Sequence, residues 1–325
     1  MGITSDIKKV KLASPKTLGY LVVIIAATLE ALRQILSKAL LMPADDITTE
    51  LNPVTISFFI FIINGLFFSP LARKSGSIRD IKKSDLILLL LIGIAESSAL
   101  ITYFFGLRNS TALNASVLNN GEIMFSILLA LIIFREKLQK TERIPFSLII
   151  IGMVALPIGY DFYTNGITMT NLVFGDILLL LAGFFWALDI NMSHHISSRL
   201  GSKRITQLAS FSAGLFALCL ILGFQIPFKI DLMHLSSIAI IGIVSIGMST
   251  ALFITGLKLI GAVRTILIYS INSAFGVIFS SLFLHESLSV ASILSVCIAF
   301  LGIYLLRNRL GGGGQKLTVG DKEKA

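Results

Sequence analysis

An internal duplication of long apolar stretches constrains the fold of this chain more than any other feature of its sequence. Residues 101–138 align without a gap to residues 251–288, about 150 positions further on. The identical pairs include Gly106 with Gly256, near the start of the two copies. A repeat of this size indicates a molecule built from two equivalent structural units.

The apolar runs of the chain are long enough to cross a lipid bilayer. Of its 325 residues, 55% are hydrophobic and only 14% are charged, whereas about a quarter of the residues in a globular domain are charged. Ten runs lie near the ~20 residues that span a hydrocarbon core: 18–41, 53–72, 85–107, 111–134, 144–160, 172–196, 205–224, 235–257, 262–284 and 290–306. We therefore expect an all-α polytopic membrane protein with ten transmembrane helices.

Basic residues are concentrated in alternate connections between these runs. The loops after the second, fourth, sixth and eighth runs, together with both ends of the chain, hold nearly all the Lys and Arg residues. Because cytoplasmic loops of membrane proteins are enriched in Lys and Arg, we expect both termini in the cytoplasm. Topology then explains the net charge of +9, and we expect no nucleic-acid partner.

The duplication predicts four parts of the chain: a cytoplasmic N-terminal segment (1–17), a first five-helix repeat (18–162), a second five-helix repeat (163–308) and a disordered C-terminal tail (309–325). Five is an odd number of spans, so the second repeat enters the membrane from the opposite side and the repeats are inverted. Many secondary transporters have inverted repeats, with a substrate site near the middle of the membrane.

Polar and charged side chains within the apolar runs are the candidates for a transport site. A charge at the centre of a bilayer costs ~2.5–3.5 kcal/mol on insertion scales, so it needs a partner, water or a function. The candidates for binding substrate or a coupling ion are Glu30, Arg33, Glu96, Asn119, Glu122, Trp186, Asp189, Ser249, Tyr269 and Asn272.

Structural roles are open alternatives for several of these candidates. Glu30 and Arg33 stand three residues apart, so they can simply neutralise each other within one helix. Glu122 has no basic neighbour in its own run, and a polar side chain of the run 262–284 can hold it by a hydrogen bond. Asp189 stands near the cytoplasmic end of its run, where snorkelling can solvate a carboxylate.

The sequence also resembles the EamA-type drug/metabolite transporter superfamily. The resemblance covers residues 18–306 and rests on the five-plus-five plan, on Trp186 with the alanine after it, and on the matching run ends FREKL and LHESL. It implies a central cavity formed by the first, third, fourth, sixth, eighth and ninth helices, with the fifth and tenth at the edge. Members of this superfamily move amino acids, other metabolites, sugar conjugates or toxic cations, mostly outward in prokaryotes.

We expect a secondary transporter that moves a small metabolite by alternating access, with export as its direction. Glu30, Glu96 and Glu122, near mid-depth, predict a cavity that is neutral to negative. Such a cavity favours an amino acid-like solute, zwitterionic or cationic, or a proton taken up by a carboxylate. It disfavours phosphate esters, which need clustered basic side chains. An exporter of drugs or toxic cations is the main alternative, and an intramembrane enzyme, a sensor and a channel are weaker ones.

The expected partners follow from this function. They are a small-molecule substrate, the lipid bilayer and a coupling proton or ion, and a homodimer through the fifth and tenth helices is an open alternative. The sequence holds no nucleotide fingerprint, metal-ligand spacing or catalytic set, so we expect no enzyme activity, cofactor or metal. We expect the protein in the cell membrane of a prokaryote.

Overall fold

The computed structural model describes residues 15–41, 51–73, 81–118, 121–133, 140–152, 171–197, 199–228, 230, 232–288 and 290–312. Within these ranges the regular elements are helices, and no β-strand occurs. The predicted all-α fold class is therefore confirmed for the described part of the chain. Most of the predicted N-terminal segment, the tail after residue 312 and the candidate Asn119 lie outside the described residues.

The helices of the first half are α1 (Pro15–Leu41), α2 (Pro53–Ala72), α3 (Lys83–Asn109), α4 (Ala112–Leu118), α5 (Gly121–Ile133) and α6 (Lys140–Ile150). Local sequence explains where some of them begin. The Asn52 side chain accepts a hydrogen bond from Val54 N at 2.9 Å and so caps α2. Pro53 then occupies the first helical position, where no backbone donor is needed.

The second half begins with α8 (Asn171–Ser197) and α9 (Ser202–Gly223), followed by α10 (Leu232–Ile240), the π-helix η5 (Ile241–Met248) and α11 (Ser249–Ile260). It ends with α12 (Ala262–Tyr269), α13 (Asn272–Leu284) and α14 (Val290–Gly312). The wide turns of a π-helix are rare and are frequently found at functional sites. Here they fall in the middle of the helical stretch that runs from α10 to α11.

Among the residues that the structure describes, six helical stretches are long and apolar enough to cross a membrane: Lys16–Leu41, Pro53–Ala72, Lys83–Asn109, Val173–Ser197, Ser202–Gly223 and His234–Ile260. Two shorter apolar helices are Asn272–Leu284 and Val290–Leu305. Large apolar side chains also cover the outside of the bundle, for example Leu282, which is 63% exposed. Helices that are apolar on all sides are typical of a protein embedded in lipid.

The prediction of one continuous helix over 262–284 is wrong, because the helix breaks at Ser270 and Ile271. At the break, the N–H groups of Ile271 and Ser273 donate to carbonyl oxygens three residues back instead of four, which is the pattern of a tight 3₁₀ turn. A tight turn rotates the following residues relative to an unbroken helix. Helical spacing therefore no longer predicts that Tyr269 and Asn272 share one face.

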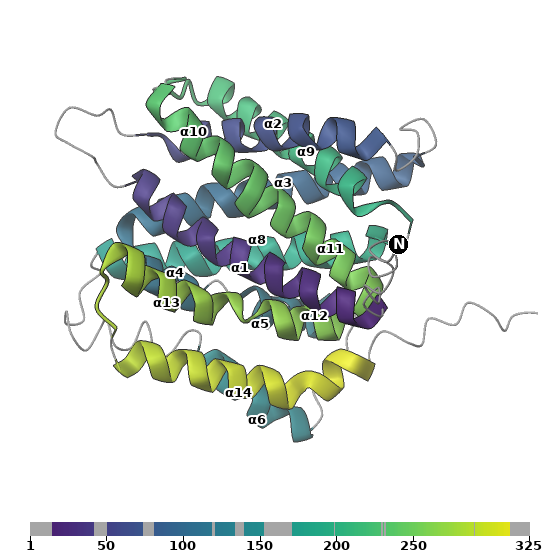
Figure 1. Ribbon diagram of the computed structural model, residues 1–325, viewed down its shortest axis with the longest axis vertical. Coiled ribbons are helices and arrows are strands. Elements are labelled where there is room, and N and C mark those ends of the chain that lie inside the picture. Colours follow the sequence, from purple (N-terminus) through teal and green to yellow (C-terminus); the bar gives the residue numbers. More distant parts are fainter. Residues whose placement is uncertain are drawn as a thin grey trace, which may run out of the picture.

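The helices form a bundle in which central elements are flanked by pairs at opposite edges (Figure 1). In that view α2 and α9 lie along the top, whereas α6 and α14 lie together at the bottom. Between them α3 packs along α8, and α1 packs along α11 and also contacts α13. The fifth and tenth predicted helices, to which α6 and α14 belong, are thus at the edge of the bundle.

The two halves of the chain contact each other through matched positions. A Cβ atom added at Gly65 would lie 2.9 Å from the Phe211 ring, and one added at Gly214 would lie 2.8 Å from Ile62. Gly214 stands 149 positions after Gly65, and Phe211 stands 149 positions after Ile62. The contact between α2 and α9 is therefore reciprocal, with each glycine receiving the side chain at the equivalent position of the other helix.

The contact between α6 and α14 has the same reciprocal form. A Cβ atom at Gly152 would lie 2.5 Å from Ala299 N, and one at Gly302 would lie 2.8 Å from Ile149 N. Gly302 and Ala299 stand 150 positions after Gly152 and Ile149. Contacts that exchange in this way arise where a twofold axis relates two units.

Candidate functional site

A cavity lies among the central helices and is lined from both halves of the chain. The space inside it that the centres of water molecules can reach has a volume of about 70 Å³. Because roughly 10–15 Å³ measured in this way holds one water, the cavity has room for a small solute or a few waters. Its walls combine carboxyl groups, aromatic rings and aliphatic side chains: Glu30, Arg33, Phe61, Glu96, Leu100, Glu122, Trp186, Asp189, Ile190, Ser193, Ile246, Thr250, Phe253, Ile254 and Tyr269.

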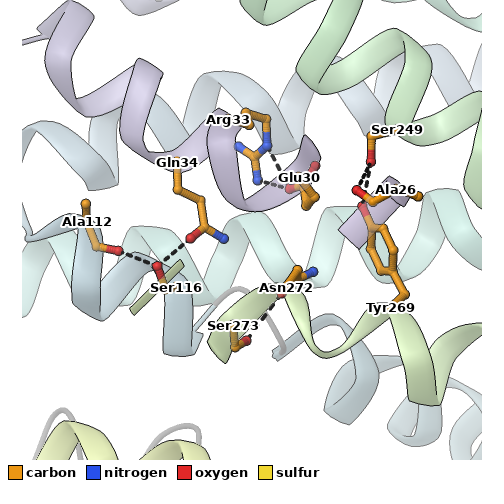
Figure 2. A network of polar contacts seen from close by, with 10 residues as sticks. All are labelled: Ala26, Glu30, Arg33, Gln34, Ala112, Ser116, Ser249, Tyr269, Asn272 and Ser273. Carbon is orange, nitrogen blue, oxygen red and sulfur yellow. Dashed lines mark hydrogen bonds and ion pairs between the residues drawn. The ribbon is translucent and has the colours of Figure 1, made fainter. Parts of the chain in front are cut away.

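Glu30 and Arg33 form an ion pair on one face of α1, as Figure 2 shows. Arg33 Nε donates to Glu30 Oε1 at 2.7 Å, and Arg33 Nη2 donates to the same oxygen. Only 1% of Arg33 and 8% of Glu30 are exposed. Because isolated buried charges are very costly, the predicted neutralisation within one helix occurs, and the pair also lines the cavity.

Two aromatic rings hold the Arg33 guanidinium from the other side. Its Cζ lies 4.2 Å from the centroid of the Tyr103 ring and 4.6 Å from that of the Trp186 ring. A cation over an aromatic face is attracted by the ring quadrupole, more strongly when water is absent. The charge of Arg33 is therefore neutralised by Glu30, and its guanidinium lies against two rings.

Three more carboxyl groups enter the cavity, each from a different helix. Glu96 comes from α3, Glu122 from α5 and Asp189 from α8. The Ser193 hydroxyl donates to Asp189 Oδ1 at 2.8 Å. Within the described residues, neither Glu96 nor Glu122 has a hydrogen-bond or ion-pair partner. Since Arg33 is neutralised by Glu30, the cavity has an excess of acidic groups.

Tyr269 is held in the cavity wall by a short chain of hydroxyl groups (Figure 2). Its hydroxyl lies 3.3 Å from Ser249 Oγ, and Ser249 Oγ donates to the Ala26 carbonyl oxygen at 2.9 Å. These contacts join α12 to α11 and α11 to α1. The Tyr269 ring also packs against Phe253, with 4.7 Å between the ring centroids. Ser249 thus positions Tyr269 without lining the cavity itself.

Asn272 does not line the cavity. It is fully buried at the start of α13, and its Oδ1 accepts a hydrogen bond from Ser273 Oγ at 3.3 Å. Nearby, the Ser116 hydroxyl donates to the Ala112 carbonyl oxygen at 2.7 Å and also contacts Gln34 Oε1 (Figure 2). These contacts belong to the packing of α1, α4 and α13.

Seven of the ten sequence candidates line the cavity. The exceptions are Ser249 and Asn272, which are buried without lining it, and Asn119, which lies outside the described residues. The helices implied by the family resemblance all contribute, through α1, α3, α5, α8, the stretch from η5 to α11, and α12. In addition, α2 contributes Phe61, which no feature of the sequence had indicated.

The lining residues that were not among the ten candidates are mostly aliphatic or aromatic: Phe61, Leu100, Ile190, Ser193, Ile246, Thr250, Phe253 and Ile254. In a chain that is apolar nearly everywhere, an apolar side chain carries no signal of its orientation. Thr250 could have been found, because it directly follows the candidate Ser249 at the end of the π-helix.

A second group of polar side chains lies at the end of the bundle where α1 and α3 finish. Lys38 Nζ donates to Leu107 O at 2.8 Å and to Ser110 O at 2.5 Å. The Ser110 hydroxyl donates to Asp176 Oδ1. These contacts tie α1, the connection from α3 to α4 and the start of α8 together.

Glu286, just after α13, joins the same end of the bundle. Its Oε1 accepts from Ala112 N at 2.9 Å, and its Oε2 accepts from Leu113 N at 2.8 Å. Backbone N–H groups in the first turn of a helix lack partners within it, so a carboxylate there is stabilising. We call these four side chains from both halves of the chain the end cluster: Lys38, Ser110, Asp176 and Glu286.

In the portion of the chain that the structure describes, no three His, Cys, Asp or Glu side chains converge in an arrangement that could hold a metal ion. The acidic residues of the cavity come from separate helices and face a common space. The arrangement suits the binding of a cationic group in that space better than the coordination of an ion by converging ligands.

Comparison with known proteins places these features in a family. A model of the EamA-like transporter family matches the chain twice, over residues 17–156 and 173–308. An uncharacterized transporter of Methanothermobacter thermautotrophicus is 31% identical over 302 residues, which cover 89% of this chain and 85% of the relative. An uncharacterized transporter of Clostridium kluyveri is 23% identical over 290 residues, covering 87% and 91% of the two chains.

The fold is also found among solved structures. One crystal structure superposes with a TM-score of 0.59 and covers 93% of this chain and 99% of its own. Its sequence identity of 17% is low, so the likeness concerns the fold alone.

Proposed function

Because the chain belongs to the EamA-like transporter family and is thus a membrane transporter, we propose that it moves a small amino acid-like solute, zwitterionic or cationic, by alternating access. The observation that carries this proposal is the set of carboxyl groups of Glu96, Glu122 and Asp189 around one cavity. In the described part of the chain, the single basic side chain of that cavity is neutralised by Glu30.

The chemistry of the cavity favours an ammonium group over an anion. Buried carboxylates are costly without a compensating charge, and a bound cation supplies that charge. Aromatic rings in the wall, such as Phe61 and Phe253, add cation–π attraction. An anion that has no ammonium group, such as a phosphate ester, would need an available basic side chain, and Arg33 is held by its own helix and by two rings.

Glu122 is the residue that we assign to coupling. It is 7% exposed and has no hydrogen-bond or ion-pair partner among the described residues. A carboxyl group in this setting can hold either a proton or the substrate ammonium group, because each neutralises the same charge. Exchange of the two on opposite sides of the membrane would couple an inward proton gradient to export of the solute.

The reciprocal contacts of α2 with α9 and of α6 with α14 support an arrangement of two five-helix repeats. We propose that these repeats are inverted, that they provide ten spans, and that both termini face the cytoplasm, as the distribution of basic residues indicates. In this orientation the end cluster lies on the outer side. Its bonds between α1, α4, α8 and the end of α13 would then close the cavity from outside.

The experiment that tests this proposal is uptake into proteoliposomes driven by a pH gradient. Radiolabelled leucine, lysine and isobutylamine serve as probes of the zwitterionic and cationic classes. We expect gradient-driven uptake by the native protein and its loss, at least tenfold, in Glu122→Gln. Asp85→Asn is the matched control, because Asp85 is also buried but pairs with Arg199 at 2.8 Å, outside the cavity lining. Undiminished gradient-driven uptake by Glu122→Gln would refute the coupling role.

Export of toxic lipophilic cations is the second candidate, and the acidic, aromatic walls of the cavity favour it. The size of the cavity decides against it in this conformation. The volume of about 70 Å³ that water centres can reach corresponds to roughly five to seven waters. A tetraphenylphosphonium ion needs a far larger volume. If tetraphenylphosphonium inhibits isobutylamine uptake competitively, export of lipophilic cations becomes the favoured function in place of transport of a small amino acid-like solute.

A further inference from the structure

We propose that a small apolar cavity beside Glu122 is a subsite for the side chain of the substrate, and that the substrate is an amine or amino acid with a short, branched aliphatic group. This inference rests on the proposed function, since it assigns the orientation of a solute already bound in the central cavity. It explains how the protein recognises the apolar side chain of the solute, which the carboxyl groups cannot bind.

The side cavity directly adjoins the central one. The space that the centres of water molecules can reach in it has a volume of about 20 Å³. The side cavity shares Glu122, Ile190, Phe253 and Tyr269 with the central cavity. Three further side chains belong to it alone: Ile123, Ser126 and Ile266. A solute whose ammonium group pairs with Glu122 therefore has an apolar recess beside that group.

The walls of the side cavity explain why this recess should take a hydrocarbon group. Among the described residues, the polar side chains in its wall other than Glu122 are Ser126 and Tyr269, each through its hydroxyl. The Ser126 hydroxyl accepts a hydrogen bond from Asn191 Nδ2 at 3.4 Å, and the Tyr269 hydroxyl lies 3.3 Å from Ser249 Oγ. With these groups engaged, water in the recess gains few hydrogen bonds, so its displacement by an apolar group is favourable.

The volume limits the size of the group. The volume of about 20 Å³ that water centres can reach is enough for one or two waters. The branched end of an isopropyl or isobutyl group is of similar size. The wall is also firm, because Tyr269 is fixed through Ser249 to the Ala26 carbonyl oxygen. We therefore expect affinity to rise with side-chain size up to leucine and to fall for an aromatic side chain.

Ile266 is the residue that sets this limit. It comes from α12, lines the side cavity and does not line the central one. Replacing it changes the recess while leaving the carboxyl groups untouched. Ile266→Ala enlarges the recess, and Ile266→Phe fills it. Ile278→Ala is the matched control, because Ile278 lies on α13 and is 49% exposed on the outside of the bundle.

The test measures inhibition constants against isobutylamine uptake in proteoliposomes for alanine, valine, leucine and phenylalanine. With the native protein we expect binding about fourfold tighter for each added methylene up to leucine, the factor that corresponds to ~0.8 kcal/mol per buried CH₂. Ile266→Ala should move the optimum to phenylalanine, and Ile266→Phe should move it to alanine. Ile278→Ala should leave the order unchanged.

The outcomes separate this inference from the function on which it rests. If isobutylamine and the amino acids are transported but the order of the inhibition constants is the same in the Ile266 variants as in the native protein, the proposed subsite is wrong and the transport function stands. If none of the probes is transported or binds, as checked by the absence of a thermal shift in detergent, both proposals fail. A shift in the optimum with Ile266→Ala and Ile266→Phe, but not with Ile278→Ala, supports the subsite.

Discussion

Arg33 illustrates how one buried charge is accommodated among apolar helices. Its guanidinium is bound by Glu30 on the same helix and lies over the rings of Tyr103 and Trp186. The ion pair lowers the cost of burying either partner alone, and the rings supply attraction that does not depend on water. The same arrangement removes the positive charge from the substrate space, so the remaining carboxyl groups define its character.

A double-mutant cycle should reveal the strength of this pair. Glu30→Gln leaves Arg33 charged in the apolar interior, and breaking a buried pair in this way costs about 3–5 kcal/mol. We expect a clear fall in the melting temperature of the detergent-purified protein for Glu30→Gln. The double variant Glu30→Gln with Arg33→Gln should recover much of that loss. If the two single losses simply add in the double variant, the pair does not stabilise the fold as proposed.

Close helix contacts in this molecule depend on small residues at equivalent places in the two halves. At Gly302 an added Cβ atom would lie 2.7 Å from the Pro145 carbonyl oxygen, and at Gly152 the equivalent atom would lie 2.7 Å from the Ser295 carbonyl oxygen. Backbone atoms cannot rotate away as a side chain can. Small residues at helix interfaces in membranes allow such approach, and van der Waals packing rewards it.

The reciprocity of this contact makes a prediction at the level of the helices. Gly152→Ala and Gly302→Ala should each force α6 and α14 apart and destabilise the protein by a similar amount, about 1–3 kcal/mol. The control is Gly223→Ala, because a Cβ atom there would meet no atom within 4 Å. Thermal unfolding in detergent measures all three. Unequal effects of the two interface variants would argue against an equivalent role in the two halves.

At the scale of the whole molecule, the cavity and the end cluster describe one conformation of the proposed transport cycle. At one end of the bundle, Glu286 accepts hydrogen bonds that join the second half of the chain to the first. Lys38 makes hydrogen bonds within the first half, to Leu107 O and Ser110 O. Hydrogen bonds to charged groups contribute about 1.5–3 kcal/mol each. Breaking them should therefore shift the population toward a state in which that end is open.

Labelling of a cavity cysteine from outside tests this shift. Thr250→Cys places a thiol in the cavity wall, and Cys219→Ser with Cys297→Ser removes the native thiols. In this background Glu286→Gln should raise the rate of labelling by an external, membrane-impermeant maleimide about tenfold, since ~1.4 kcal/mol is a tenfold change in an equilibrium. Arg143→Gln, an exposed site on α6, is the control. An unchanged labelling rate would show that the end cluster does not close the cavity.

Much of the fold and part of the site follow from the amino-acid sequence alone. Helix lengths, the duplication and the cost of a charge in an apolar run are local properties, so they can be read without knowing how the helices pack. Charged candidates such as Glu96, Glu122 and Asp189 were therefore predictable, and all three line the cavity. The pairing of Glu30 with Arg33 was also open to prediction, because both belong to one helix turn.

Only the tertiary structure decided which side chains meet. Phe61 and Phe253 face the cavity, and Asn272 does not, because these orientations depend on how each helix is rotated against its neighbours. A helix that is apolar on all sides has no polar face to report its rotation. The 3₁₀ turn at Ser270 and the π-helix η5 add local rotations that an ideal helical period cannot include. The sequence thus determined which groups must be buried together, and packing determined which of them share the cavity.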